Sequence, residues 1–207
     1  MHGQRRRGSG PERSGATMRL FFAVWPPEET AEALHRWARR VREATGGRAV
    51  DACAIHLTLA FLGAFPESHL GKVLASARRA GAAPHALPLD AARQVARRGL
   101  VWAGPAQTPP LLEALATSLQ AELRSEGFEL DRREFLAHVT LLRQAGTRVE
   151  LPQLPPLDWP VTEFTLVQSR LGSGPANYEI LARFPLVAGE RVSGDPAPPK
   201  SRASAGQ

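Results

Sequence analysis

Apolar residues recur along the chain at two different spacings, and each spacing predicts one type of secondary structure. Large apolar residues three or four positions apart form one face of a helix, and they predict helices at 27–44, 66–80 and 109–125. Short apolar runs bounded by Gly or Pro predict strands. The predicted strands are 19–25, 56–62, 87–90, 100–103, 135–142, 161–171 and 178–184. Strands and helices therefore alternate along most of the chain.

The most clearly marked elements lie in the second half of the chain. In the helix at 109–125, proline stands at the start, leucines form one stripe and Gly127 follows the end. The segment 172–175, Gly-Ser-Gly-Pro, predicts a turn that joins the last two strands into a hairpin. The order strand–helix–strand–helix, repeated and then followed by a hairpin, predicts an α+β domain of two similar lobes.

The length and composition are those of an ordinary globular protein. The 207 residues suit one domain or two small lobes that share a core, and 43% of the residues are hydrophobic. No run of 18 apolar residues is present and no apolar stretch follows the basic N-terminus, so neither a membrane span nor a secretory signal is expected. The single cysteine, Cys53, excludes an internal disulfide and a multi-cysteine zinc site, and it favours a cytoplasmic location.

The two ends of the chain differ in composition from the middle. Residues 1–17 are rich in Gly, Ser and Arg, and residues 188–207 are rich in Pro, Gly, Ser and Ala, so both are predicted to be disordered tails around a domain at 18–187. The first tail carries four arginines against one glutamate, which is +3 of the formal charge of +6. The second tail carries +1, so the predicted domain carries only +2. That charge is too small to argue for nucleic-acid binding by itself.

Two short motifs carry the candidate chemistry. His56-Leu57-Thr58-Leu59 and His138-Val139-Thr140-Leu141 each lie in a predicted strand. Alternate residues of a strand face the same side, about 6.5 Å apart. Each histidine therefore shares a face with the threonine that follows it, while the aliphatic residues face the opposite, buried side. One such motif is often a polar pair at the edge of a sheet, but two with the same flanking pattern indicate a shared site.

These residue types suit acid–base chemistry on a phosphodiester. Near neutral pH one imidazole can be neutral and accept a proton while another is protonated and donates one. Attacking and leaving oxygens lie roughly in line at phosphorus, so histidines on opposite sides of one cleft have the required placement. The hydroxyls of Thr58 and Thr140 can donate to phosphate oxygens. No metal or other cofactor is required, and no additional His or Cys is spaced to complete a zinc site.

With these motifs the chain resembles the two-histidine (2H) phosphoesterase superfamily, in its RNA 2′,3′-cyclic phosphodiesterase branch, also called bacterial 2′-5′ RNA ligase. The matching segments lie within 18–187, and they are MRLFFAV, HLTLAFLG, HVTLLR and YEILARF. The resemblance implies a bilobal fold in which two antiparallel sheets face a central cleft and the helices lie outside. It also implies hydrolysis of terminal 2′,3′-cyclic phosphates of RNA to 2′-phosphomonoesters, with reverse 2′-5′ ligation in some members. We expect the protein to be a monomer.

The resemblance also supplies roles that the two equivalent motifs cannot. It implies that His56 is the proton donor, that His138 is the proton acceptor and that Arg143 contacts the phosphate. Because Arg143 lies an odd number of positions after His138, this contact requires a bulge in the strand. The sequence departs from the family at Ala54, where Asn is frequent, and at Ala137, where Pro is frequent. Among the aromatic residues, Phe21 or Phe22 and Tyr178 are candidates to stack on a base.

Two alternatives remain at the level of sequence. Another two-histidine activity, on a small cyclic nucleotide or a cyclic ADP-ribose phosphate, would use the same reacting groups. A non-catalytic RNA-binding module would keep the fold but lose a motif residue, whereas here both motifs are intact.

Overall fold

The computed structural model describes residues 17–131, 133–170 and 177–188, so the turn at 172–175 and nearly all of both predicted tails lie outside the described residues. The described helices are α1 (Glu28–Thr45), α2 (Leu70–Arg79) and α3 (Pro110–Ser125), with short 3₁₀ turns at Ala52–Ala54, Glu67–His69 and Ala96–Arg98. The strands are β1 (Thr17–Val24), β2 (Arg48–Ala49), β3 (Leu57–Pro66), β4 (His85–Leu89), β5 (Ala91–Val95), β6 (Leu100–Gly104), β7 (Val139–Arg143), β8 (Leu157–Val161), β9 (Glu163–Arg170) and β10 (Asn177–Pro185).

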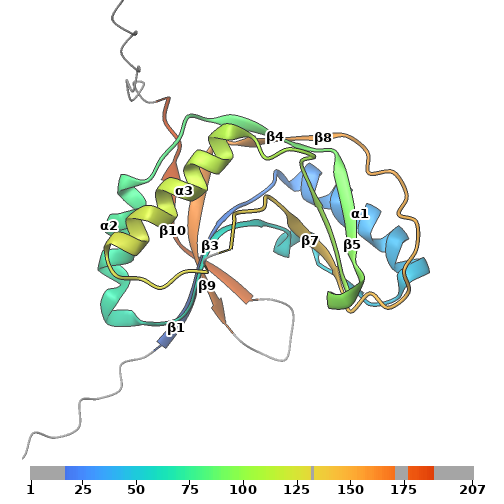
Figure 1. Ribbon diagram of the computed structural model, residues 1–207, viewed down its shortest axis with the longest axis horizontal. Helices are drawn as coiled ribbons and strands as arrows, with labels where there is room; N and C mark the ends of the chain where they lie inside the picture. Colours follow the sequence, from blue (N-terminus) through green and yellow to red (C-terminus); the bar gives the residue numbers. More distant parts are fainter. Residues whose placement is uncertain (1–16, 132, 171–176, 189–207) are drawn as a thin grey trace, which may run out of the picture.

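The strands form two antiparallel halves that meet at one residue pair. One half has the order β10-β9-β1-β3, and the other has the order β7-β6-β5 with β2 also paired to β7. Between the halves, β3 and β7 pair only at Leu57 and Val139. β4 and β8 form a separate two-stranded sheet, which runs between the α3 and α1 sides of the molecule (Figure 1). The predicted α+β class with two antiparallel sheets is therefore confirmed, and the two sheets are continuous through a single pair.

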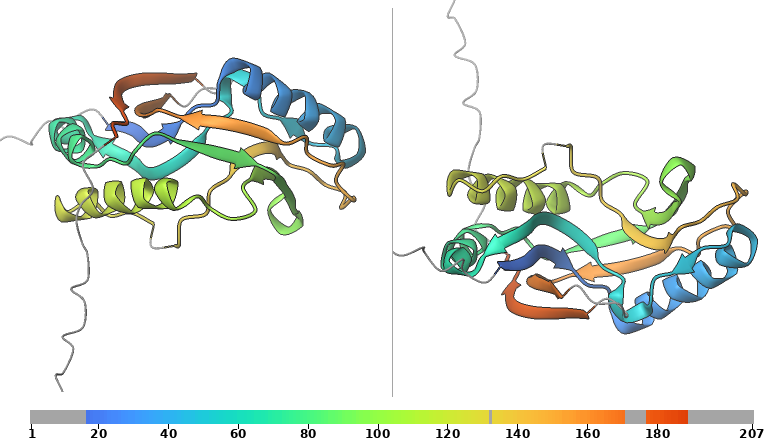
Figure 2. Two further views of the ribbon diagram at one scale, coloured as in Figure 1. Left: turned by 90° about the horizontal axis from the view of Figure 1, so that it is seen from above. Right: turned by 90° about the horizontal axis from the view of Figure 1, so that it is seen from below.

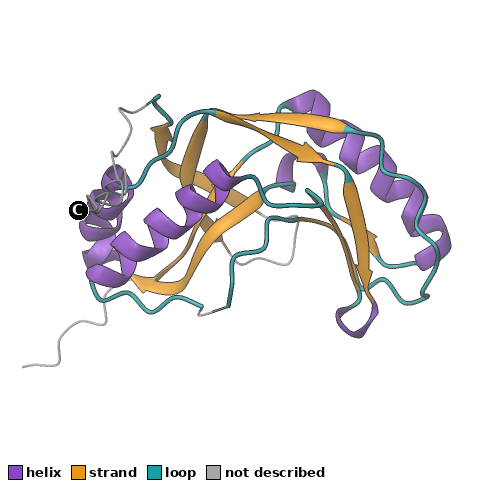
Figure 3. Cartoon of the chain, turned by 45° about the horizontal axis from the view of Figure 1, so that its top comes forward, coloured by secondary structure: helices purple, strands orange, loops and turns teal. Residues whose placement is uncertain are grey.

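The helices cover the two halves from outside. α2 and α3 pack on each other and against β10 and β3, whereas α1 packs against β2 and β7 of the other half. The two groups lie on opposite sides of the molecule (Figure 2), with the strands between them (Figure 3). Since β1 belongs to the first half and α1 covers the second, the chain crosses between the halves as soon as β1 ends. Each half therefore needs the other to complete its core.

None of the described helices is long and apolar enough to cross a membrane.

The core follows the alternation of β1. Leu20, Phe22 and Val24 are fully buried in the main hydrophobic core, where Phe22 packs against Phe164 and Phe184. The alternate residues Phe21 and Ala23 belong to a second small cluster on the opposite face. β1 therefore has two apolar faces, as expected for a strand at the centre of a layered fold.

All three predicted helices are present, but the strands differ from the prediction in several places. β7 begins at Val139 rather than at 135, because residues 135–138 belong to no strand or helix. The sequence prediction missed β2, β5 and β8. β2 has only two residues, β5 lacks large apolar residues before its last position, and β8 contains Pro160. Such strands are determined by their partners rather than by local pattern.

Gly104 of β6 provides a test of how closely the strands approach beside the second motif. A Cβ at this position would lie 2.4 Å from the carbonyl oxygen of Ala137 and 3.4 Å from Cα of His138. We expect Gly104→Ala to lower the free energy of unfolding by about 1–3 kcal/mol, because the backbone must move to admit the methyl group. Gly71→Ala in α2 is the control, since nothing lies within 4 Å of its Cβ position. Urea denaturation of both variants measures the difference, and equal midpoints would show that β6 moves freely.

Candidate active site

The single pair between the sheet halves brings the two motifs together. Leu57 and Val139 are fully buried partners, and the antiparallel register extended by one residue sets His56 opposite Thr140 and His138 opposite Thr58. The two histidines and two threonines are all partly exposed, whereas their aliphatic neighbours are buried. The predicted division of faces is confirmed. The prediction that the histidines lie within strands is wrong, because each immediately precedes its strand.

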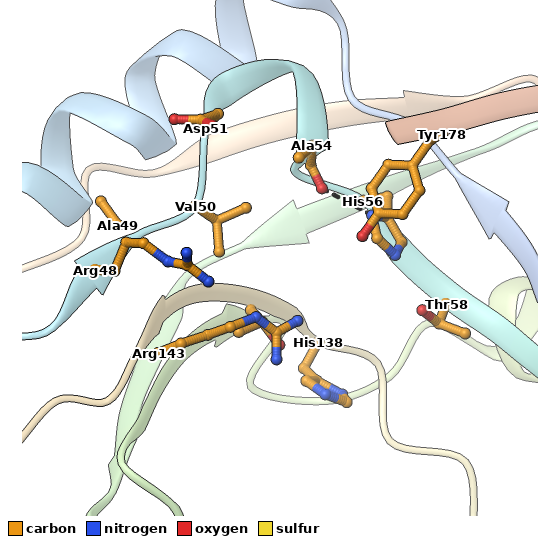
Figure 4. Close-up of a pocket in the computed structure, with 11 residues that line it drawn as sticks. Arg48, Ala49, Val50, Asp51, Ala54, His56, Thr58, His138, Arg143 and Tyr178 are labelled. Atoms are coloured by element: carbon orange, nitrogen blue, oxygen red, sulfur yellow. Dashed lines mark hydrogen bonds between the residues drawn. The ribbon is translucent and has the colours of Figure 1, made fainter. Parts of the chain in front are cut away.

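The five predicted site residues line one pocket of about 210 Å³. Figure 4 shows the histidines on opposite sides of this pocket, with the Arg143 guanidinium beside His138 and Thr58 beside His56. The pocket also contains groups that sequence reasoning did not assign to the site. These are Arg48, Ala49, Val50 and Asp51, from β2 and the residues after it.

Both catalytic candidates are held by the same local hydrogen bond. Nδ1–H of His56 donates to the carbonyl oxygen of Ala54, and Nδ1–H of His138 donates to that of Leu136, each at 2.8 Å. A carbonyl oxygen can only accept, so Nδ1 carries the proton and Nε2 is left to exchange a proton in the pocket. His85 makes the same bond to Ala83 at 2.9 Å outside the pocket. The bond therefore fixes the imidazole tautomer, but it does not by itself mark a catalytic histidine.

The two histidines differ in their surroundings. His56 is packed among the rings of Phe21, Trp25 and Tyr178, whose centroids lie 4.9, 5.0 and 5.3 Å from its own. Burial lowers the pKa of His56 from 6.5 to about 4; the bond to Ala54 opposes this, and the charges of Arg143 and His138 add to it. In the free protein at neutral pH, His56 is therefore uncharged.

The aromatic residues proposed to stack on a base have different fates. Phe22 is fully buried in the main core, and Phe21 is 3% exposed beneath His56, so neither offers a face to a ligand. Tyr178 is partly exposed and lines the pocket. Trp25 beside it is fixed by a hydrogen bond from its indole N–H to Thr165 Oγ1 at 2.9 Å. Of the three proposed rings, only Tyr178 is available.

Arg143 reaches the pocket through the expected bulge. β6 and β7 shift register between Val101 and Trp102, so Leu141 is the additional residue on β7. Leu141 and Leu142 are consequently both buried, and Arg143 returns to the face of Thr140. The predicted bulge is present, and Arg143 lines the same pocket as the two histidines; its contact with phosphate stays a prediction.

Arg48 stands directly opposite Arg143 in the β2–β7 pair and adds a second guanidinium to the pocket. Its position depends on Gly47, which has φ +82° and whose Cβ would lie 2.5 Å from the carbonyl oxygen of Arg143. In the sequence, the Gly46-Gly47 pair was the available signal that two backbone segments approach closely here. A two-residue strand is too short to show a hydrophobic period, so the sequence pattern could not place Arg48 in the pocket.

The groups that line the pocket have the chemistry that suits a small anion. Two guanidiniums, two hydroxyls and two imidazole Nε2 atoms line the pocket, and Asp51 is its one carboxylate. Arginine and hydroxyl donors suit the oxygens of a phosphate. In the described part of the chain no three His, Cys, Asp or Glu residues cluster as metal ligands. The arrangement can bind a phosphate ester between two groups that exchange protons.

Comparisons with known proteins agree with this chemistry. The model of the family described as LigT-like phosphoesterase matches residues 24–102. The chain is 38% identical over 174 residues to the RNA 2′,3′-cyclic phosphodiesterase of Escherichia coli, covering 82% of this chain and 97% of that protein. It is 33% identical over 201 residues to the Thermus thermophilus enzyme of the same name, covering 86% and 100%. The E. coli LigT structure complexed with 3′-AMP superposes with a TM-score of 0.78 at 35% identity, covering 83% and 99%.

The pKa of His56 can be measured directly. We expect the imidazole of His56 to titrate near pH 4 in the free protein, because its charged form is poorly hydrated. Inorganic phosphate should raise this pKa, since a nearby anion favours the imidazolium. NMR titration of the imidazole Cε1–H signal, assigned by comparison with His56→Gln, gives both values. A pKa near 6.5 in the free protein would show that the imidazole is hydrated rather than buried.

Proposed function

The chain belongs to the LigT-like phosphoesterase family, and from this we propose that it hydrolyses the 2′,3′-cyclic phosphate at the end of RNA to a 2′-phosphomonoester. Its relatives from E. coli and T. thermophilus are named for activity on RNA 2′,3′-cyclic phosphates. The observation that carries the proposal is the placement of two His-x-Thr motifs across a phosphate-sized pocket lined by two arginines.

Hydrolysis requires one proton to be taken and another to be given. In the proposed reaction Nε2 of His138 accepts a proton from water, and the water oxygen forms a bond to phosphorus. The bond from phosphorus to O3′ breaks in line, and Nε2–H of His56 protonates the leaving O3′. The products are a 2′-phosphate and a free 3′-hydroxyl. A 5′-hydroxyl of a second RNA in place of water gives 2′-5′ ligation by the same steps.

This assignment requires His56 to gain its proton with the substrate. Burial keeps His56 neutral in the free protein, and a phosphodiester anion in the pocket reverses that preference because it stabilises the imidazolium directly. The donor is then charged only while the phosphodiester is bound, and its proton goes to the leaving O3′. If the pKa of His56 stays near 4 with phosphate bound, the roles of the two histidines are exchanged.

The remaining pocket groups act on the non-bridging oxygens. Thr58 and Thr140 line the pocket beside the two histidines, and in the proposed reaction their hydroxyls donate to the phosphoryl oxygens as negative charge develops. Arg143 and Arg48, on paired positions of β7 and β2, hold the phosphate between the imidazoles.

We further propose that the enzyme is a cytoplasmic monomer and that residues 18–187 form the catalytic domain.

Replacing either histidine tests the acid–base pair. His56→Ala and His138→Ala should each lower kcat by about 10²–10⁴-fold, and the double variant should be little worse than either, because the two act as a unit. The assay uses a 2′,3′-cyclic-phosphate oligoribonucleotide in excess EDTA, with identification of the phosphate position in the product. Activity of the unaltered enzyme should survive EDTA, since the mechanism has no metal step.

His69→Ala is the matched control, because His69 is exposed and lines neither the pocket nor a neighbouring groove. Circular dichroism establishes that each variant is folded. Full turnover by a folded His56→Ala or His138→Ala variant would overturn the mechanism. Loss of activity in EDTA with recovery on added metal would require a different one.

Replacing the threonines by valine removes the hydroxyls while preserving shape. Thr58→Val and Thr140→Val should each lower kcat by about 10²–10³-fold, as loss of an oxyanion donor does in other enzymes, with a smaller change in KM. Thr117→Val on the exposed face of α3 is the control. An effect confined to KM would show that the hydroxyls bind the ground state and transition state equally.

A further inference from the structure

A second and larger depression continues from the catalytic pocket on the side away from Arg48. It has a volume of about 820 Å³, roughly four times that of the pocket, and the two share Thr58 and His138 as walls. One side of this groove is the β5–β6 hairpin, and the other is formed by residues 130–131 and 133–136 and by Gln120 of α3. Because the shared residues belong to the catalytic motifs, a molecule in the groove can reach the reacting phosphate directly.

The groove is basic although the domain as a whole is nearly neutral. Five arginines line it against two carboxylates, Asp131 and Glu134. Asp131 is paired with Arg133, which lowers the pKa of that carboxyl to about 2. Among the described residues, the other four arginines form no ion pair. They are Arg93, Arg97, Arg98 and Arg148.

Apolar and aromatic side chains accompany these arginines. Phe61 is 45% exposed and Leu136 is 56% exposed, and both line the groove near the catalytic motifs. Trp102 lies with its ring centroid 5.7 Å from that of His138, and the guanidinium of Arg93 stands over the Trp102 ring at 5.7 Å. A continuous series from His138 through Trp102 to Arg93 therefore leads outward from the site.

We propose that this groove binds the single-stranded RNA segment that precedes the cyclic phosphate, and that the enzyme therefore prefers oligonucleotide ends to cyclic mononucleotides. The inference deepens the proposed function and rests on it. Unpaired arginines supply contacts for backbone phosphates. Exposed apolar and aromatic side chains supply surfaces for unstacked bases, which duplex RNA does not offer. The terminal phosphate occupies the smaller pocket, so the groove of about 820 Å³ beside it provides space for the rest of the strand.

The test compares two substrates that differ only in length. One is adenosine 2′,3′-cyclic phosphate, and the other is a four-nucleotide RNA ending in the same cyclic nucleotide. We expect kcat/KM to be larger for the oligonucleotide, mainly through KM, and the advantage to shrink as salt rises. For single strands the logarithm of the binding constant falls with the logarithm of the salt concentration, with a slope of about −0.7 per phosphate contact.

Charge reversal at the hairpin tip locates the effect. The double variant Arg97→Glu and Arg98→Glu should raise KM for the oligonucleotide about tenfold or more at low salt. It should also reduce the salt dependence of that KM and lower the ratio of kcat/KM for the oligonucleotide to kcat/KM for the mononucleotide. The matched control, Arg39→Glu with Arg78→Glu, makes the same charge change at exposed helix positions outside the groove. That control should keep the ratio near its original value.

A second variant separates base contacts from charge. Phe61→Ala should lower the length advantage while leaving the salt dependence unchanged, because no charge is removed. Equal kcat/KM for both substrates, or an equal loss in the helix control, would overturn the groove proposal while the proposed reaction stands. Failure to turn over either cyclic substrate would instead overturn the proposed function.

Discussion

The backbone pairing of Leu57 with Val139 is the constraint on which the site depends. It is the single register pair between the two halves of the large sheet, so the strands diverge on either side of it. This divergence leaves the motif residues beside the pair accessible, while the pair itself is buried. Loss of this pair would separate the two histidines, because each lies directly beside it. Two helices hold the halves together, because each packs on the half opposite to the strand it follows. α1 follows β1 and packs on β2 and β7, and α3 follows β6 and packs on β3.

Much of this arrangement could be predicted from the sequence, because periodicity reports burial. The faces of the two motifs followed from alternation with Leu57 and Val139, and the bulge that places Arg143 followed from its odd offset. Arg48 and Asp51 could not be found this way. Arg48 enters the pocket through a two-residue strand that pairs with β7, and Asp51 follows that strand. Such pairing is a tertiary property without a local period.

The surroundings of the two histidines could not be predicted from the sequence either. Two motifs of equivalent sequence give two imidazoles with the same Nδ1 hydrogen bond, so nothing local distinguishes them. The difference arises from Phe21, Trp25 and Tyr178, which come from distant segments and pack around His56, whereas Trp102 is the aromatic neighbour of His138. Long-range packing thus makes a chemically symmetric pair unequal, which an acid–base mechanism requires.

Net charge is a similarly incomplete guide to ligands. The predicted domain carries only +2, which argued against reading nucleic-acid affinity from composition. The fold distributes that charge unevenly over the surface. Outside the groove, ion pairs with arginines involve the carboxylates of Glu122, Glu126, Glu163 and Glu179. Along the groove, four arginines have no such partner among the described residues. A locally positive channel therefore needs no excess of positive charge overall. It needs acidic residues placed where other arginines neutralise them.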